Sequence, residues 1–125
     1  GGDVAIMAMG CMVHEALEAA GELARRGIET TVIDLYSVKP IDEEAIVRAA
    51  EETGAVVTAE EHNLPGGLGG AVAEVLVETV PVPVVRVGIR DSFCESGPPE
   101  ELFAKYGLTV PDIVRAAEKA VARKK

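Results

Sequence analysis

The sequence has few of the side chains that build metal centres and reactive thiol sites. Its 125 residues include two cysteines and two histidines. Cys11 and Cys94 lie far apart and form no CxxC or Cys/His pattern at metal-ligand spacing, so we expect two reduced thiols in a cytoplasmic protein. His14 falls near the start of a predicted helix, with Glu18 one turn later, and is expected at the surface or in an interface. We expect no metal site.

Long apolar runs and an excess of positive charge are also missing. No apolar run approaches the ~20 residues of a membrane-spanning helix, and there is no signal-peptide pattern. Acidic side chains outnumber basic ones by 21 to 12, giving a net charge of −9. Because this charge repels phosphate backbones, we expect neither a nucleic acid partner nor a membrane.

No hydroxyl or thiol has the surroundings of a catalytic nucleophile. Ser92 and Ser96 lie outside a GxSxG pattern. The negative charge of Glu95 beside Cys94 disfavours a thiolate. We therefore expect no catalytic residue, and no activity from this segment alone.

Short apolar runs alternate with amphipathic stretches along the whole chain. The connections between the runs hold a dozen or more residues, as parallel strand pairing requires. Right-handed crossovers then place helices on both faces of a sheet. We predict one α/β domain over residues 1–125, a three-layer α/β/α structure with a mainly parallel sheet of four to five strands. The predicted strands are 4–9, 28–35, 55–59 and 84–89, and the predicted helices are 12–26, 42–53, 68–79, 98–107 and 110–123.

The spacing of apolar residues predicts which face of each helix is buried. Gly27 is expected to end the first helix and Gly54 the second. The residues expected inside are Val13, Leu17, Ala20 and Ala24 in the first helix, Ile46, Val47, Ala49 and Ala50 in the second, Leu68, Val72, Val75, Leu76 and Thr79 in the third, and Ile113, Val114, Ala117 and Val121 in the last.

The most distinctive polar residues follow the third predicted strand, at the strand end where ligands dock in open α/β sheets. The glycines that come next do not form GxGxxG, because Val72 stands at the third glycine position, and they are not a P-loop. Close strand–helix packing explains them; an anion held by backbone N–H groups is the alternative. Neighbouring carboxylates point to opposite sides of a strand, so we expect them to accept backbone hydrogen bonds or to reach across an interface. The candidate loop or interface site comprises Glu60, Glu61, His62, Asn63, Gly66, Gly67 and Gly69.

Several motifs together resemble the C-terminal domain of transketolase. They are VIDLYSVKPID at residues 32–42, TAEEH at 58–62 and GGLGGAVAE at 66–74. The runs DSFCESG at 91–97 and ELFAKYGLT at 101–109 are similar to the family's F-x-x-S-G loop and F/Y-G-L-T turn. The resemblance covers essentially the whole chain in the right order.

The resemblance implies a role in a larger enzyme. Transketolase transfers a two-carbon ketol unit between sugar phosphates in the pentose phosphate pathway, with thiamine diphosphate and a divalent metal. Its cofactor lies between two other domains, while the C-terminal domain is mostly structural and adds to the homodimer interface. This sequence has no GDG followed further on by Asn, the diphosphate–metal motif of thiamine enzymes. The resemblance thus implies no bound cofactor here. The implied partners are the N-terminal and pyrimidine-binding domains, in the same or a separate chain.

Three other interpretations remain open. 1-Deoxyxylulose-5-phosphate synthase and the β subunits of 2-oxoacid dehydrogenase E1 share this domain, although Ser96-Gly97 and the turn at 106–109 favour transketolase. A free-standing module that binds an anion or nucleotide at the glycine loop belongs to another class.

Because Asp3 leads straight into a strand and no initiator methionine precedes it, we expect an excised segment of a longer protein.

Overall fold

The computed structural model describes residues 2–9, 12–35, 43–60, 68–87 and 110–124. In this part of the chain, the strands β1 (Val4–Ala8), β2 (Thr30–Asp34), β3 (Val56–Ala59) and β4 (Val84–Val87) form one sheet in the order β2-β1-β3-β4. Every neighbouring pair is parallel. The predicted parallel α/β sheet is confirmed, with four strands in the described residues.

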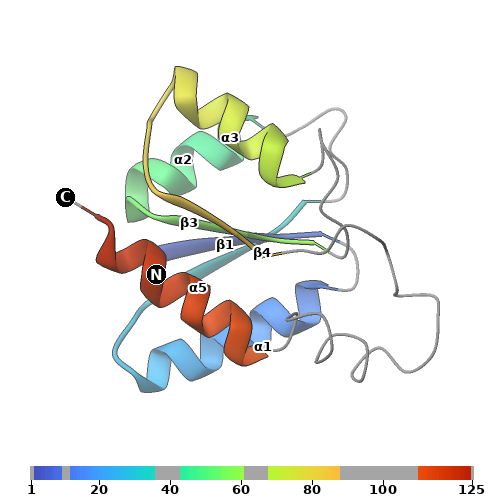
Figure 1. Cartoon of the computed structure of the whole chain (residues 1–125), viewed down its shortest axis with the longest axis vertical. Helices are drawn as coiled ribbons and strands as arrows, with labels where there is room; N and C mark the ends of the chain where they lie inside the picture. The colour runs from blue at the N-terminus through green and yellow to red at the C-terminus, as the bar shows by residue number, and fades with distance from the viewer. Residues whose placement is uncertain (1, 10–11, 36–42, 61–67, 88–109, 125) are drawn as a thin grey trace.

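Helices cover both faces of this sheet (Figure 1). One face carries α1 (Met12–Arg25) and α5 (Val110–Ala122), and the other carries α2 (Glu43–Thr53) and α3 (Leu68–Glu78). All five side chains of β1 are buried because this central strand lies between two helical layers. Val4, Ile6 and Ala8 pack toward α1 and α5, whereas Ala5 and Met7 pack toward α2 and α3. This alternation confirms the three-layer α/β/α prediction.

The buried face of α1 differs from the prediction. The fully buried residues of α1 are Met12, Ala16, Ala19 and Leu23. Of the predicted residues, Val13 packs against the same core and Ala20 is partly buried, whereas Leu17 is 56% exposed and Ala24 is exposed. The helix has two adjacent apolar stripes, and periodicity alone cannot tell which one meets the sheet. The stripe that packs on the sheet is the one with the longer side chains, Met12 and Leu23, at its two ends.

The other helices mostly follow the prediction. Ile46, Ala49 and Ala50 of α2 are buried. Val72 and Leu76 of α3 are buried and Val75 is partly so, but Thr79 is exposed because α3 ends at Glu78. In α5, Ile113, Val114 and Ala117 are buried and Val121 is partly buried. The predicted helix at 98–107, both cysteines and the side chain of Leu68 lie outside what the structure describes.

Glycine ends α1 and α2, as predicted. Gly27 has φ 82° and Gly54 has φ 75°. The N–H of Gly27 donates to the carbonyl of Ala24 at 3.1 Å, and the N–H of Ile28 donates to the carbonyl of Leu23 at 2.9 Å. This pair of bonds is a Schellman motif, and it turns the chain from α1 into β2. In the described ranges, no helix has the length and apolar character needed to cross a membrane.

Candidate functional site

Glu60 lies where the chain leaves β3, at the carboxyl edge of the sheet. Its backbone N–H donates to the carbonyl of Val87 at 3.1 Å, so the adjoining strand fixes its position. The strand order places the topological switch point between β1 and β3, directly beside Glu60. The sequence therefore sets this carboxylate at the place where α/β sheets usually bind ligands.

The Glu60 side chain points to the start of α3 and is only 4% exposed. Its Oε1 accepts a hydrogen bond from the backbone N–H of Gly69 at 3.3 Å. A carboxylate is favourable there because the first turn of a helix carries unpaired N–H groups and positive partial charge. The prediction that this glutamate accepts a backbone hydrogen bond is confirmed for Glu60.

Gly69 lets the helix approach the sheet closely. A Cβ atom at this position would lie 2.9 Å from Cγ of Arg86, closer still to Cδ of Arg86, and 3.1 Å from Oγ1 of Thr58. At Gly70, by contrast, a Cβ atom would meet nothing within 4 Å. Close packing of the strands against α3 thus explains the glycine at position 69. This agrees with the packing interpretation of the glycines, whose alternative was an anion held by backbone N–H groups.

Two contributors to this junction were missed in the sequence. Thr58 and Arg86 lie on neighbouring strands at paired positions, and both contact the Gly69 position. Arg86 interrupts an otherwise apolar strand, and that irregularity was the available signal. Of the candidate site residues, the structure brings Glu60 and Gly69 together, while Glu61, His62, Asn63, Gly66 and Gly67 lie outside the described residues.

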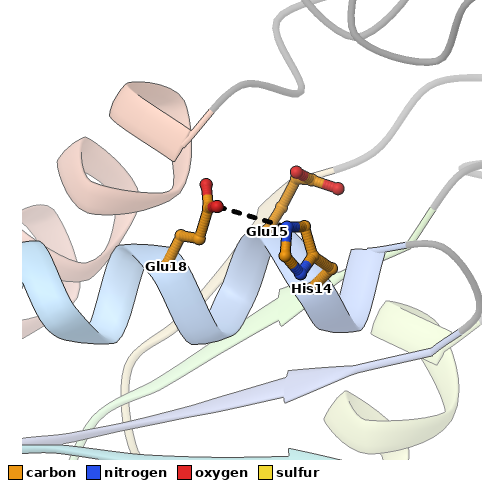
Figure 2. A group of neighbouring side chains, drawn as sticks. All are labelled: His14, Glu15 and Glu18. Carbon is orange, nitrogen blue, oxygen red and sulfur yellow. Dashed lines mark ion pairs between the residues drawn. The ribbon is translucent and has the colours of Figure 1, made fainter.

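A second polar cluster lies on α1 and comprises His14, Glu15 and Glu18 (Figure 2). Nε2 of His14 lies 3.2 Å from Oε1 of Glu18, and these side chains are 74% and 55% exposed. Imidazole and carboxylate groups suit a borderline divalent cation, and one possible ligand atom from each residue lies within 4.8 Å of the others. Exposed pairs one helical turn apart are also common without any ion, and they add only a few tenths of a kcal/mol, about 0.3–0.5, to stability. His14 is a surface residue, as predicted.

The fold and the β3–α3 junction define a parallel α/β/α domain in which the Glu60 carboxylate accepts a hydrogen bond from the start of α3. Residues 1–113 match the family described as "Transketolase, C-terminal domain". The chain belongs to this family, which confirms the resemblance found in the sequence motifs.

Two relatives show the range of proteins that carry this domain. The chain is 56% identical over 124 residues to the 6-deoxy-6-sulfo-D-fructose transketolase subunit SqwH of Clostridium sp., an alignment that covers 99% of this chain and 38% of the relative. It is 48% identical over 126 residues to 1-deoxy-D-xylulose-5-phosphate synthase 1 of Geobacter sulfurreducens, covering 99% of this chain and 20% of the relative.

Solved structures give the same result. A split-gene transketolase described as an inactive beta4 tetramer superposes with a TM-score of 0.91 at 55% identity, covering 100% of this chain and 41% of that chain. The H261F mutant of transketolase from Pichia stipitis superposes with a TM-score of 0.64 at 20% identity, covering 96% of this chain and 16% of that chain, and so shows the fold alone. The chain spans well under half the length of these relatives and structures.

Proposed function

We propose that this chain is the C-terminal assembly domain of a transketolase, of the split type in which the enzyme is made of two polypeptides. The observation that carries the proposal is the 56% identity to a transketolase subunit along 99% of the chain. Its partners are the N-terminal and pyrimidine-binding domains, within the same polypeptide or a separate one, and the assembled enzyme is a homodimer in the cytoplasm. Residues 1–125 are one segment of that longer enzyme.

The whole enzyme transfers a two-carbon ketol unit between sugar phosphates, and thiamine diphosphate with a divalent metal supplies the carbanion chemistry when bound. The described residues of this chain do not fit that cofactor. At the carboxyl edge of the sheet, the N–H of Gly69 already donates to the carboxylate of Glu60. The sequence also lacks GDG followed by Asn. On these grounds we propose that the segment binds no cofactor and is inactive alone, and that its own residues hold the β3–α3 junction in place.

The coding sequence on either side of the segment provides the first test. A GDG…Asn motif in the same frame or in an adjacent gene identifies the missing domains. The two polypeptides are then produced separately and assayed for ketol transfer with thiamine diphosphate and Mg²⁺. Activity of the mixture, with neither part active alone, supports the proposal. Activity of this chain alone, or an inactive mixture that has formed a complex, contradicts it.

A second candidate, 1-deoxy-D-xylulose-5-phosphate synthase, is favoured by the 48% identity to a protein of that name. The alignment covers 20% of that relative but 38% of the transketolase subunit. A single reading frame about five times the length of this chain therefore favours the synthase, and a frame two to three times its length favours the split subunit. Formation of 1-deoxy-D-xylulose 5-phosphate by the assembled enzyme decides between them.

A further inference from the structure

Lys124 connects the two helical layers at the amino edge of the sheet. It lies just beyond the end of α5, which covers one face, whereas Thr53 is the last residue of α2, which covers the other. Nζ of Lys124 donates a hydrogen bond to the carbonyl of Thr53 at 2.7 Å, across 71 positions of sequence. Figure 1 shows α5 and α2 ending at the same side of the sheet. We call this contact the Lys124 bridge.

The bridge satisfies a carbonyl at the end of α2. The last four C=O groups of a helix have no partner within the helix itself. Gly54 ends α2 with a φ of 75°, and its N–H donates to the carbonyl of Ala50 at 2.8 Å. The carbonyl of Thr53, a residue only 4% exposed, receives its hydrogen bond from Lys124. Lysine is favourable at a helix C-terminus, where the dipole is negative, but this lysine comes from a different helix.

The stem of Lys124 lies against the backbone that it caps. A Cβ atom at Gly54 would lie 3.3 Å from Cδ of Lys124. Lys124 is itself partly buried, so its ammonium group is shielded from part of the solvent. A hydrogen bond from a charged donor is stronger than one between neutral groups. The bridge therefore combines a charged cap with close contact of the side-chain stem.

A hollow of about 520 Å³ borders the bridge, and its lining includes Gly54, Pro81, Pro83 and Lys124. The proline wall is held by the sheet, because the carbonyl of Pro83 accepts a hydrogen bond from the N–H of Val56 at 2.9 Å. Proline also fixes the backbone φ on that side.

The opposite wall is the end of α5, and it is less regular. The N–H of Arg123 is shared between the carbonyls of Lys119 and Ala120, both at 3.2 Å. Such shared hydrogen bonds are common at helix termini. The end of α5 is thus the part that moves when the bridge breaks.

We propose that the Lys124 bridge is a conformational device that holds the end of α2 closed and joins it to the α5 layer. With the bridge formed, the last turn of α2 opens only together with the end of α5. With the bridge broken, that turn opens by itself while the sheet stays folded, as a local opening of low free energy. This inference concerns the chain itself and does not depend on the proposed function.

The test is amide hydrogen exchange in Lys124→Met, with Lys119→Met as the matched control. Lys119 is an exposed lysine on α5, so both variants lose one positive charge from the same region. Methionine at position 124 keeps an unbranched stem beside Gly54 but cannot donate. We expect exchange of the Gly54 amide to accelerate by at least about ten-fold in Lys124→Met and to stay unchanged in Lys119→Met.

The amides of β1 serve as the internal reference, because the central strand opens only when the whole domain unfolds. They should exchange at the same rate in Lys124→Met as in the wild-type chain. Equal acceleration at Gly54 and in β1 would make Lys124 a contributor to global stability alone and would overturn the proposal. An unchanged rate at Gly54 would overturn it as well.

Lys124→Arg distinguishes the charged donor from the shape of the side chain. Arginine keeps the charge and has N–H donors, so this variant should retain most of the protection of the Gly54 amide. If Lys124→Arg exchanges as fast as Lys124→Met, the protection follows the shape of the lysine stem and the proposed bridge is wrong.

Discussion

Gly69 and Gly70 are neighbours in the first turn of α3, yet the space around them differs. A Cβ atom at Gly69 would press on Arg86 and on Thr58, which is 1% exposed and cannot move away. Arg86 is exposed and can shift, so Thr58 sets the remaining cost. A Cβ atom at Gly70 would meet nothing within 4 Å. The two glycines thus form a matched pair for testing close strand–helix packing.

We predict that Gly69→Ala lowers the free energy of unfolding by about 1 kcal/mol, as overpacking does. Gly70→Ala should raise it by about 0.5–1 kcal/mol, because alanine restricts the unfolded chain and favours helix. Urea denaturation of both variants measures the difference. In an Arg86→Ala background the cost of Gly69→Ala should shrink, since one of the two contacts is gone. Equal effects at the two glycines would remove the packing explanation.

Gly27 is required for its backbone conformation rather than for space. Its φ of 82° lies in the left-handed region, and no neighbour comes within 4 Å of a Cβ atom there. We predict that Gly27→Ala lowers the free energy of unfolding by about 1–2 kcal/mol, the cost of left-handed backbone for an L-residue. Gly27→Asn should cost less, because asparagine tolerates this region. Thermal unfolding of the two variants checks the ranking, and an alanine variant as stable as the wild type would contradict it.

The structural role of a residue could be predicted from the sequence where local backbone geometry determines that role. It could not be predicted where contacts between distant segments determine it. Gly27 and Gly54 were recognised because a helix end needs φ > 0 whatever surrounds it. Leu17 was placed inside wrongly, because α1 is apolar on two stripes and only the sheet selects between them. Thr58 and Arg86 were missed because their role depends on the neighbouring strand and on α3, neither of which is local in sequence.

At the scale of elements, α3 places adjacent residues in opposite environments. Leu76 is 1% exposed and packs in the core between α2, α3 and the sheet, whereas Val77 is 73% exposed. We predict that Leu76→Ala lowers the free energy of unfolding by about 2–4 kcal/mol, through lost burial and the cavity left behind. Val77→Ala should change it by no more than about 0.5 kcal/mol. Chemical denaturation measures both, and a small effect of Leu76→Ala would mean that α3 docks loosely on the sheet.

The end of α1 is joined to α5 by a chain of charges. Arg26 and Arg25 donate hydrogen bonds to Glu22, and Arg26 also donates to Glu118 on α5 at 3.0 Å. The hydrogen bond from Arg26, followed by that from Arg25, holds the pKa of Glu22 below its ordinary value. In the unfolded chain Glu22 takes up its proton at higher pH than in the folded chain. Its contribution to stability is therefore complete above the unfolded pKa and is lost as the pH falls through the folded pKa.

We predict that Glu22→Gln reduces the loss of stability on acidification through the carboxylate range. The variant should be less stable than the wild type at neutral pH and should approach it in acid. Because these groups are exposed, added salt should narrow the difference. Urea denaturation at a series of pH values provides the measurement. Parallel pH profiles for the two proteins would show that Glu22 has the same affinity for protons in the folded and unfolded chains.

The sequence predicted which segments form strands and which form helices. It was less accurate for the residues at which they begin and end, and it did not predict which strands lie side by side. The strand predicted from residue 28 begins at Thr30, because the N–H of Ile28 still donates to the carbonyl of Leu23 at the end of α1. The order β2-β1-β3-β4 was not predicted, since apolar runs show that strands exist but not which of them pair. Of the candidate site, the sequence predicted that the carboxylates after β3 accept backbone hydrogen bonds or reach across an interface, but it did not identify Gly69 as the donor to Glu60.

At the scale of the whole molecule, the carboxyl edge of the sheet distinguishes two classes of function, an assembly domain and a free-standing ligand-binding module. Many α/β proteins bind their ligands at this edge. A free-standing module would hold an anion at the start of α3, with backbone N–H groups and the helix dipole. In this chain the N–H of Gly69 donates to the Glu60 carboxylate, whose side chain is almost fully buried. An incoming phosphate would have to displace this carboxylate and then lie close to its negative charge. The geometry at the start of α3 therefore counts against a module that binds an anion there.

We predict that pyrophosphate, with or without Mg²⁺, leaves the melting temperature of the chain unchanged. A ligand at about 100 times its dissociation constant would stabilise the fold by about 2.7 kcal/mol, a shift of roughly ten degrees for a domain of this size. Glu60→Ala provides the comparison, because it removes the carboxylate and leaves the N–H of Gly69 open to an anion. Pyrophosphate should then stabilise the variant but not the wild type. Equal stabilisation of both proteins would place the anion elsewhere on the molecule, and stabilisation of the wild type alone would make Glu60 part of a ligand site and favour the free-standing module.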